Sequence, residues 1–261
     1  MLLAAALLML YPLLWMVAGS LRPQAEIFQA PGLLVKDPQF QNYSTGWEAL
    51  ASPFGHYLLN SFTVVLGAVL GNLISCSLAA YAFARIDFKA KKALLAIMLL
   101  TIMLPFHVVI VPQYVLFSHL GWVNTILPLV IPKFLAPDAF FIFLMVQFIR
   151  GIPTELDEAA RIDGCGHIRI FGQIILPLMV PALATTAIFT FIWTWNDFFG
   201  QLIYLTDPDK YTVPVTLRSF IDSTSESSWG AMFAMSVVSL LPVFLFGQRF
   251  LIKGIATTGG K

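Results

Sequence analysis

The sequence predicts an all-α, polytopic membrane protein with six transmembrane helices. Hydrophobic residues make up 58% of the 261 positions, charged residues make up 11%, and the mean hydropathy is +0.82. This composition leaves far too little polar surface to cover a soluble globule of this length. Apolar runs also recur along the chain at about the 20 residues that an α-helix needs to cross a bilayer. Helices are expected because open strand edges in lipid leave backbone groups unpaired.

Six apolar runs are long enough to be spans. The first is uncharged and ends before Arg22, and the second and sixth carry no charged residue. The third contains His107, the fourth contains Lys133 and Asp138, and the fifth contains Asp197. The runs are Leu2–Gly19, Tyr57–Phe83, Ala93–Phe117, Ile126–Ile149, Leu178–Leu205 and Trp229–Gly247.

The first run has a second interpretation, because Val17–Gly19 near its end has the small residues of a signal-peptide cleavage site. No basic residue precedes the run, and its removal would leave five spans. We therefore expect a retained helix, with a short basic segment missing before it. The predicted organisation is a first helix at 1–19, an extracytoplasmic segment at 20–56, a core domain of five helices at 57–252 with a loop at 150–177, and a tail at 253–261.

Basic residues in the connecting loops predict the orientation. Ten lie on one side, after the second, fourth and sixth spans: Arg85, Lys89, Lys91, Lys92, Arg150, Arg161, Arg169, Arg249, Lys253 and Lys261. The opposite loops hold four basic residues against seven acidic ones. The first side is therefore expected to be cytoplasmic, together with both termini.

The charged loop between the fourth and fifth spans carries the signals of a helical hairpin. Thr154 is expected to cap the amide of Asp157, and Gly164 is suited to end the helix in a left-handed conformation. A second amphipathic segment runs from Ile168 to Leu176 and is expected to stop at Pro177. The loop is either a solvated connection or a contact surface, and the specific spacing of its residues favours the contact surface.

Several kinds of site lack their motifs. Cys76 lies within a span and Cys165 in a cytoplasmic loop, so no disulfide is expected between them. The sequence contains no CxxC or HExxH motif and no metal-spaced cluster of His and Cys. It also has no GxxxxGK[ST] phosphate loop, so any nucleotide hydrolysis by that route belongs to another chain. No catalytic or metal-ligating residue is predicted.

The hairpin carries a recognisable motif. Glu158–Ala160, three further residues, Gly164, nine further residues and then Ile174, Leu176 and Pro177 resemble the EAA motif of binding-protein-dependent ABC transporter permeases. Other segments resemble the maltose-type second permease of the carbohydrate-uptake branch. They are Phe83–Lys92, Trp195–Phe198, Leu205–Pro208, Tyr211–Pro214 and Gln248–Gly254. The tail at 256–261 departs from the usual ending of that family.

The resemblance implies a permease subunit of an importer for a sugar or sugar-like solute. Its partners would be a second permease, two ABC ATPase subunits that bind ATP and Mg, an extracytoplasmic solute-binding protein and the lipid bilayer, with no nucleic acid. The hairpin would be the coupling helix that docks on the ATPase. The residues implied in coupling are Glu158, Ala159, Ala160, Arg161, Asp163, Gly164, Ile174, Leu176 and Pro177.

Polar residues inside spans are the candidates for a substrate pathway, because lipid burial of such groups is costly. Asp138 lies either at mid-depth, facing substrate or a partner helix, or nearer the outer surface beside Lys133. Asn196 and Asp197 belong either to an aromatic interface belt or to the outer part of a substrate cavity. His107 is expected to be a hydrogen-bonded core residue, with a substrate ligand as the alternative.

A polar and small-residue stripe on the second span is interpreted as a packing surface rather than a binding stripe. Its members are Asn60, Ser61, Gly67, Gly71, Asn72, Ser75 and Ser77.

The expected mechanism is alternating access, with the loops at 20–56 and 206–229 receiving the external solute-binding protein. Proline kinks in the third span are candidate hinges. A self-contained channel or ion-driven carrier is the rival function, and a membrane enzyme would need a catalytic constellation that the sequence lacks.

Overall fold

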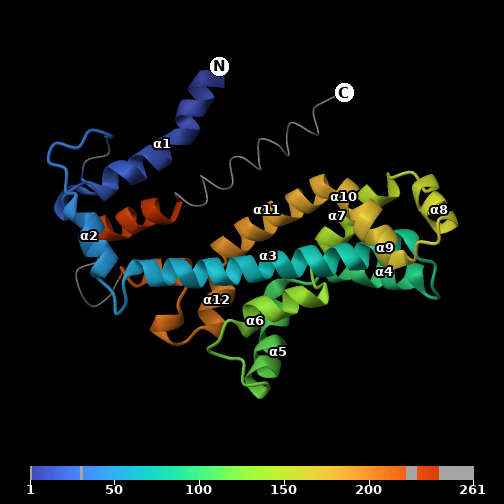
Figure 1. Ribbon diagram of the computed structural model, residues 1–261. Helices are drawn as coiled ribbons and strands as arrows, with labels where there is room; N and C mark the ends of the chain where they lie inside the picture. Colours follow the sequence, from blue (N-terminus) through green and yellow to red (C-terminus); the bar gives the residue numbers. More distant parts are fainter. Residues whose placement is uncertain (1, 30–31, 222–227, 241–261) are drawn as a thin grey trace. The chain divides into compact units, whose positions relative to one another are not determined.

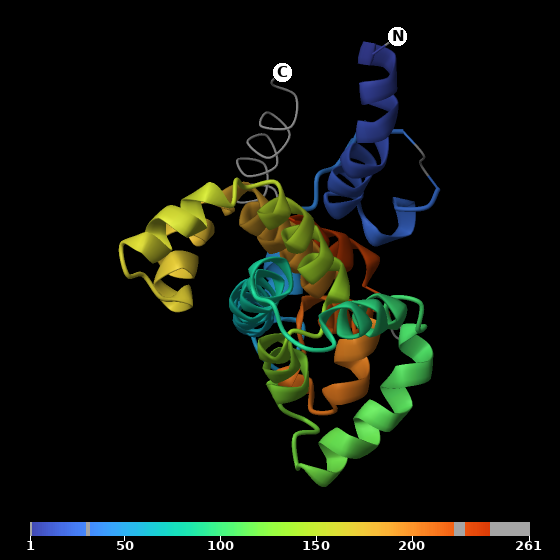
Figure 2. The same cartoon turned by 90° about the vertical axis from the view of Figure 1, so that its right-hand side faces the viewer.

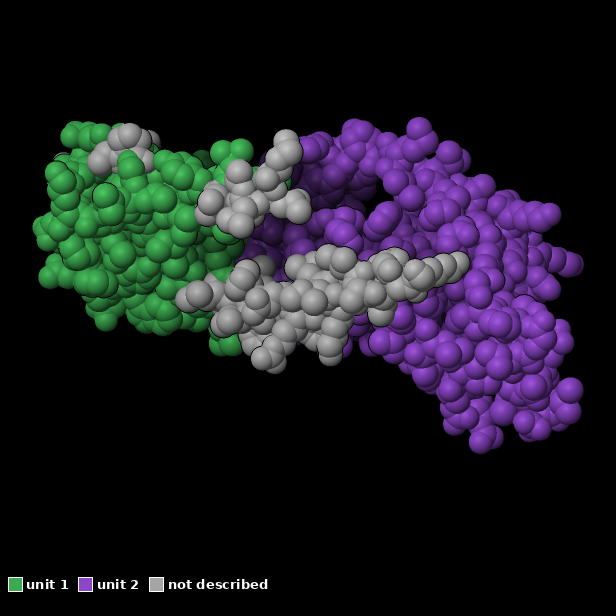
Figure 3. Space-filling model, turned by 90° about the horizontal axis from the view of Figure 1, so that it is seen from above, with its two compact units in different colours: residues 1–62, 205–248 green, residues 63–204, 249–261 purple. Residues whose placement is uncertain are grey.

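The computed structural model describes residues 2–29, 32–221 and 228–240, and every regular element among them is helical (Figure 1). The chain divides into two compact units, residues 1–62 with 205–248 and residues 63–204 with 249–261, which Figure 3 colours separately. We call them unit 1 and unit 2. The long helix α3 (Phe54–Arg85) starts in unit 1 and continues in unit 2.

Unit 1 is held together by aromatic contacts and by hydrogen bonds to loop backbone. The ring of Trp15 meets that of Phe233 edge-on at 5.5 Å, and Phe28 meets Trp229 at 5.1 Å. Asn60 Nδ2 donates to the carbonyl oxygen of Asp209 at 3.0 Å. Besides the start of α3, the elements are α1 (Leu2–Ser20), η1 (Gln24–Glu26), α2 (Gln41–Glu48), η4 (Pro208–Lys210), α13 (Val213–Arg218) and a helix at Trp229–Leu240.

Unit 2 contains the remaining helices around one apolar core. Its centre is formed by side chains of α3, α7 and α11, including Ala80, Met145 and Ala182. The elements are α4 (Lys91–Thr101), α5 (Phe106–His119), α6 (Leu127–Val130), η2 (Ile131–Leu135), α7 (Ala139–Arg150), α8 (Glu155–Ile162), α9 (His167–Ile170), the π-helical turn η3 (Phe171–Ile175), α10 (Leu176–Leu178), α11 (Val180–Asn196) and α12 (Phe199–Tyr204).

Among the described residues, α3 and the stretch Leu127–Arg150 are each long and apolar enough to cross a membrane. Two bent pairs raise the total to as many as four if each is one span. The pairs are α4 with α5, bent by 101°, and His167–Leu178 with α11, bent by 76°. The first and sixth predicted runs correspond to shorter apolar helices, and the sixth extends past residue 240, outside the described residues.

The third predicted span is therefore not one straight helix. Helix α4 ends at Thr101 and α5 begins at Phe106, so the break covers residues 102–105 and ends at Pro105. Proline cannot supply a backbone N–H and restricts the residue before it, so the expected kink occurs there. Pro112, in contrast, lies inside α5 without ending it.

The close packing predicted for the small-residue stripe on α3 is confirmed. A Cβ atom added to Gly67 would lie 2.7 Å from Val130 Cγ1, and one added to Gly71 would lie 2.9 Å from the backbone carbon of Lys133. The hydroxyl of Ser75 donates to the Lys133 carbonyl oxygen at 2.6 Å. The α6–η2 segment thus lies directly against the backbone of α3.

Replacing Gly71 by Val should destabilise the protein, because the neighbour in contact is backbone and cannot rotate away. Overpacking of this kind costs about 1–3 kcal/mol. The thermal unfolding midpoint of the purified protein in detergent should fall. Gly172→Ala is the matched control, because a Cβ there meets nothing within 4 Å. Equal midpoints for Gly71→Val and the wild type would refute the packing account.

Candidate functional site

The loop between α7 and α11 forms the predicted hairpin (residues 150–177). We call it the coupling hairpin after the role that the sequence resemblance implies for it. Helix α8 ends at Ile162, and Gly164 follows with φ +79°, the left-handed conformation expected of a helix-terminating glycine. The chain then returns through α9, η3 and α10. Figure 1 shows this hairpin at one end of the unit 2 helices, in yellow, and Figure 2 shows it viewed from that end.

Two local predictions for the hairpin are wrong. Thr154 does not cap α8 through its hydroxyl; its carbonyl oxygen accepts from the amides of Asp157 and Glu158 at 3.0 and 3.1 Å. The reason is its helical backbone conformation, since side-chain caps need an extended residue. Pro177 does not stop the second segment either. It lies in the first turn of α10, where a missing N–H is tolerated, and the bend comes after Leu178.

Helix α8 has one buried face and one exposed face. Asp157 and Ala160, three residues apart, are buried, whereas Glu158, Ala159 and Arg161 are exposed. The predicted coupling residues are therefore divided between the two faces. Asp163 and Gly164 are exposed, Ile174 and Leu176 are partly buried, and Pro177 is exposed.

Two isoleucine side chains of the hairpin are almost fully exposed. Ile162 at the end of α8 is 87% exposed, and Ile168 in α9 is 89% exposed. Together they give the charged hairpin an apolar surface that a partner protein could cover. Ile162 is not among the residues predicted from the sequence, although its position two residues before Gly164 is a usable signal.

A buried ion pair fastens the hairpin to α3. Arg85 Nε lies 2.9 Å from Asp157 Oδ2, and both side chains are 6% exposed. Arg85 Nη2 also donates to the carbonyl oxygen of Ile152 at 2.6 Å. From the sequence, Arg85 indicates only the orientation of the chain, because nothing in a single sequence shows that a basic residue at a span end is buried.

Asp138 is the centre of a second polar cluster inside unit 2. Its Oδ2 accepts from Lys133 Nζ at 2.8 Å and from Asn72 Nδ2 at 2.6 Å. Asn72 also reaches Thr190 Oγ1 on α11 at 3.1 Å. The cluster lies where the 127–150 stretch is irregular, at Ala136 with φ +54°. Asp138 thus contacts neighbouring helices, and the expected approach of Lys133 is confirmed.

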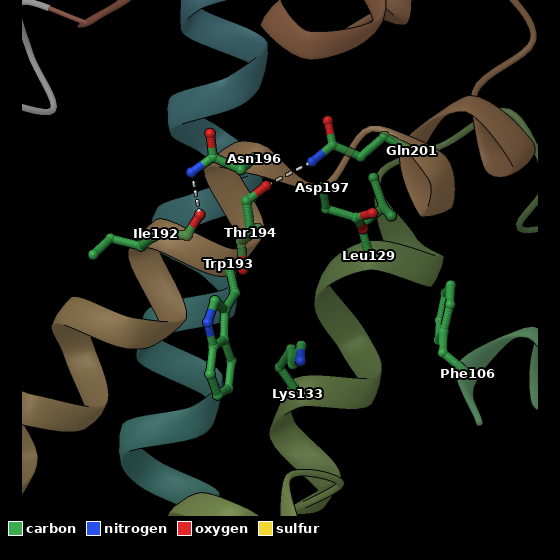
Figure 4. Close-up of a pocket in the computed structure, with 9 residues that line it drawn as sticks. All are labelled: Phe106, Leu129, Lys133, Ile192, Trp193, Thr194, Asn196, Asp197 and Gln201. Atoms are coloured by element: carbon green, nitrogen blue, oxygen red, sulfur yellow. Dashed lines mark hydrogen bonds between the residues drawn. The ribbon is translucent and has the colours of Figure 1, made fainter. Parts of the chain in front are cut away.

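A cavity of about 600 Å³ lies beside this cluster (Figure 4). Trp193 and Phe106 provide apolar walls, while Lys133, Asn196 and Asp197 provide polar groups. Asn196 Nδ2 donates to the Ile192 carbonyl oxygen at 2.8 Å, and Asp197 Oδ1 accepts from the amide of Gly200 at 3.0 Å. Both predicted residues therefore lie at the end of α11 and line this cavity.

His107 is not a core residue of this chain. It lies in the exposed first turn of α5, whose buried residues, Ile110 and Phe117, come later in the helix. The His107 ring lies 5.3 Å from that of Phe199, next to the cavity-lining Phe106.

Comparison with known proteins assigns the chain to a family. A model of the family described as binding-protein-dependent transport system inner membrane component matches residues 71–253, more than half of the 261 residues. The chain belongs to this family. It is therefore a permease, a membrane transport protein rather than an enzyme.

Relatives match the permease over nearly its whole length. A putative ABC transporter permease from Caldicellulosiruptor sp. is 34% identical over 94% of this chain and 89% of its own. The arabinooligosaccharides transport system permease AraQ of Halalkalibacterium halodurans is 32% identical, over 98% and 92%. The sn-glycerol-3-phosphate transport system permease UgpE of Yersinia pestis is 33% identical, over 98% and 93%.

A solved structure supports the same fold. It is a chain in the crystal structure of a bacterial ABC transporter involved in the import of the acidic polysaccharide alginate. Its TM-score is 0.81 at 24% identity, covering 95% of this permease and 92% of that chain. The permease thus has the fold of an ABC importer subunit.

Removing the cation of the Asp138 cluster should destabilise the permease. In Lys133→Met, Asp138 keeps only the amide of Asn72, and losing a charged hydrogen bond costs about 1.5–3 kcal/mol. Thermal unfolding in detergent should show a lower midpoint. The double variant Lys133→Met/Asp138→Asn should recover part of the loss, because the carboxylate is gone as well. Strictly additive losses would contradict the pairing. The exposed Lys92→Met is the control.

Proposed function

We propose that this permease is one of two membrane subunits of an ABC importer that carries a sugar or sugar-like solute, driven by ATP hydrolysis in separate ATPase subunits. The observation that carries the proposal is the coupling hairpin. In its helix α8, Ala160 of the EAA-like residues is buried together with Asp157, whereas Glu158, Ala159 and Arg161 are exposed, as are the nearby Ile162 and Ile168. The absence of a phosphate loop from the sequence fits an energy source outside this chain.

The proposed topology has six spans with both termini in the cytoplasm of a bacterial or archaeal cell. The long helix α3, the stretch Leu127–Arg150 and the two bent pairs supply up to four spans. The apolar runs Leu2–Gly19 and Trp229–Gly247 supply the first and last. The excess of basic residues on the side of the coupling hairpin supports a cytoplasmic hairpin.

Coupling would occur through the exposed face of the hairpin. Glu158 and Arg161 offer directional charges, while Ile162 and Ile168 offer apolar contact area to a cleft in the ATPase. ATP and Mg would bind in the two ATPase subunits and not in this chain. Closure of the ATPase pair would move the hairpin and reorient the helices between outward and inward access.

The cavity at the end of α11 is the proposed part of the solute pathway in this subunit. An aromatic wall at Trp193 and Phe106 suits the apolar face of a sugar ring, and Asn196 and Asp197 suit its hydroxyl groups. His107 would lie at the edge of this pathway, and Asp138 would hold Lys133 in position beside it. Permeases of arabinooligosaccharide, sn-glycerol-3-phosphate and diacetylchitobiose transport systems are among the relatives, which supports this substrate class.

The remaining partners would complete the importer. A second permease would form the other half of the pathway. An extracytoplasmic solute-binding protein would dock on the segments at 20–56 and 206–229, where Leu34 and Phe40 are exposed.

Ile162→Glu should weaken docking of the ATPase. A carboxylate placed in an apolar contact costs about 2 kcal/mol or more, which corresponds to a loss in affinity of more than about tenfold. The test is co-purification of the ATPase subunit with the tagged permease from membranes in which both are expressed.

Leu34→Glu is the matched control. It introduces the same charge at an apolar residue that is 91% exposed on the proposed outer side, so ATPase recovery should equal that of the wild type. Transport by the wild-type permease without any ATPase subunit would contradict the proposal and favour a self-contained channel or carrier.

A further inference from the structure

The last two turns of α3 contact both arms of the coupling hairpin. Arg85 holds the first arm through Asp157 and Ile152. One turn earlier, the Tyr81 hydroxyl lies 3.2 Å from His167 Nδ1 in the second arm, and the Tyr81 ring lies 5.3 Å from that of Phe171. Residues 81 and 85 are four apart, so they share one face of the helix.

Arg85 fixes the hairpin at two points of the first arm. Ile152 precedes α8, whereas Asp157 lies inside it, so one guanidinium spans the start of the helix. The contact with Ile152 is a hydrogen bond from the planar guanidinium, which imposes direction, and the contact with Asp157 is an ion pair. Because both side chains are 6% exposed, separating the pair would leave a buried charge unmatched, which is strongly unfavourable. Sliding helix α8 along α3, or rotating it against α3, would therefore carry a large free-energy cost.

The covalent connections of the hairpin are less rigid than this anchor. Toward α7 the chain passes through the turn at 151–154. Toward α11 it passes through the π-helical turn η3 and a bend of 76° after Leu178. Turns lack a continuous helical hydrogen-bond ladder, and π-helical segments are among the places where helices kink, so both can absorb displacement.

Helix α3, in contrast, runs unbroken for 32 residues and contains no proline. Asn72 lies on it, about 20 Å from Arg85 at 1.5 Å per residue. Asn72 binds Asp138 and Thr190 beside the cavity. A movement of the hairpin that α3 follows therefore reaches the polar cluster without crossing a bend.

We propose that Arg85 is a positioning residue that makes α3 move with the coupling hairpin, so that ATPase motion enters the bundle through α3 rather than through α7 or α11. This inference rests on the proposed function, because it assumes that the hairpin is displaced by an ATPase. It assigns to the Arg85–Asp157 pair a role in transmission and none in ATPase binding.

The test measures the distance between the hairpin and α3 in the assembled importer. One spin label is attached to Cys165 in the hairpin and one to Ile74→Cys, an exposed position on α3, with the buried Cys76 replaced by Ala. Pulsed electron paramagnetic resonance is recorded without nucleotide and with MgATP, the probe that drives the ATPase. In the wild-type background the distance distribution should be the same in both states.

In Arg85→Met the two distributions should separate, because the hairpin then moves without α3. Co-purification of the ATPase should stay at the wild-type level. Asp157→Asn should give a smaller separation, since the Ile152 contact remains, and the double variant should match Arg85→Met rather than the sum. Lys89→Met, an exposed cation in the same basic loop, should behave as wild type.

Arg85→Lys is included in case Arg85→Met fails to fold. It keeps the charge but loses the fork, so its separation should lie between those of the wild type and Arg85→Met. Identical distributions in the two states for every Arg85 variant would overturn the inference and leave the proposed function standing. Failure of the wild-type permease to retain an ATPase would overturn both.

Discussion

The close contact between α3 and the α6–η2 segment is the constraint on which the centre of unit 2 depends. Two glycines one turn apart, Gly67 and Gly71, let Val130 and the backbone of Lys133 approach α3 directly. That approach places Lys133 and Asp138 within reach of Asn72. In an apolar bundle these polar groups have few other partners, so the packing of small residues determines where charge can be accommodated.

The same helix relates the two candidate sites. Its middle carries Asn72 beside the cavity, and its end carries Tyr81 and Arg85 against the coupling hairpin. Polar contacts thus occur at two levels of one uninterrupted helix. Between them, Cys76 and Ala80 belong to the apolar core. Such an arrangement combines a rigid element with directional contacts at both ends, as a transmitting element requires.

Much of the fold could be predicted from sequence because apolar length and helix signals are local. The second run was predicted at 57–83, and α3 occupies 54–85. The positive φ of Gly164 and the break near Pro105 were also predictable. The predicted Thr154 cap failed because the backbone conformation of that residue depends on the turn before it. The sequence predicts that the helix stops at Pro177, but the helix continues to Leu178 before the bend. Proline occurs both at the start and at the end of helices, so its presence does not fix the position of the bend.

The sites were less predictable, since burial is a property of three-dimensional packing. Arg85 and Lys89 are indistinguishable in a count of loop charges, yet one is buried against Asp157 and the other is exposed. His107 resembled a core residue because its run is apolar, but the bend at 102–105 leaves the first turn of α5 uncovered.

The two exposed isoleucines of the hairpin have consequences before any transport begins. In the proposed importer, a newly made permease that has not met its ATPase would present Ile162 and Ile168 to water. Chaperones and proteases recognise such surfaces, so the hairpin that is proposed to transmit force in the complete importer would also mark an orphan subunit for removal and favour synthesis of the subunits in balanced amounts.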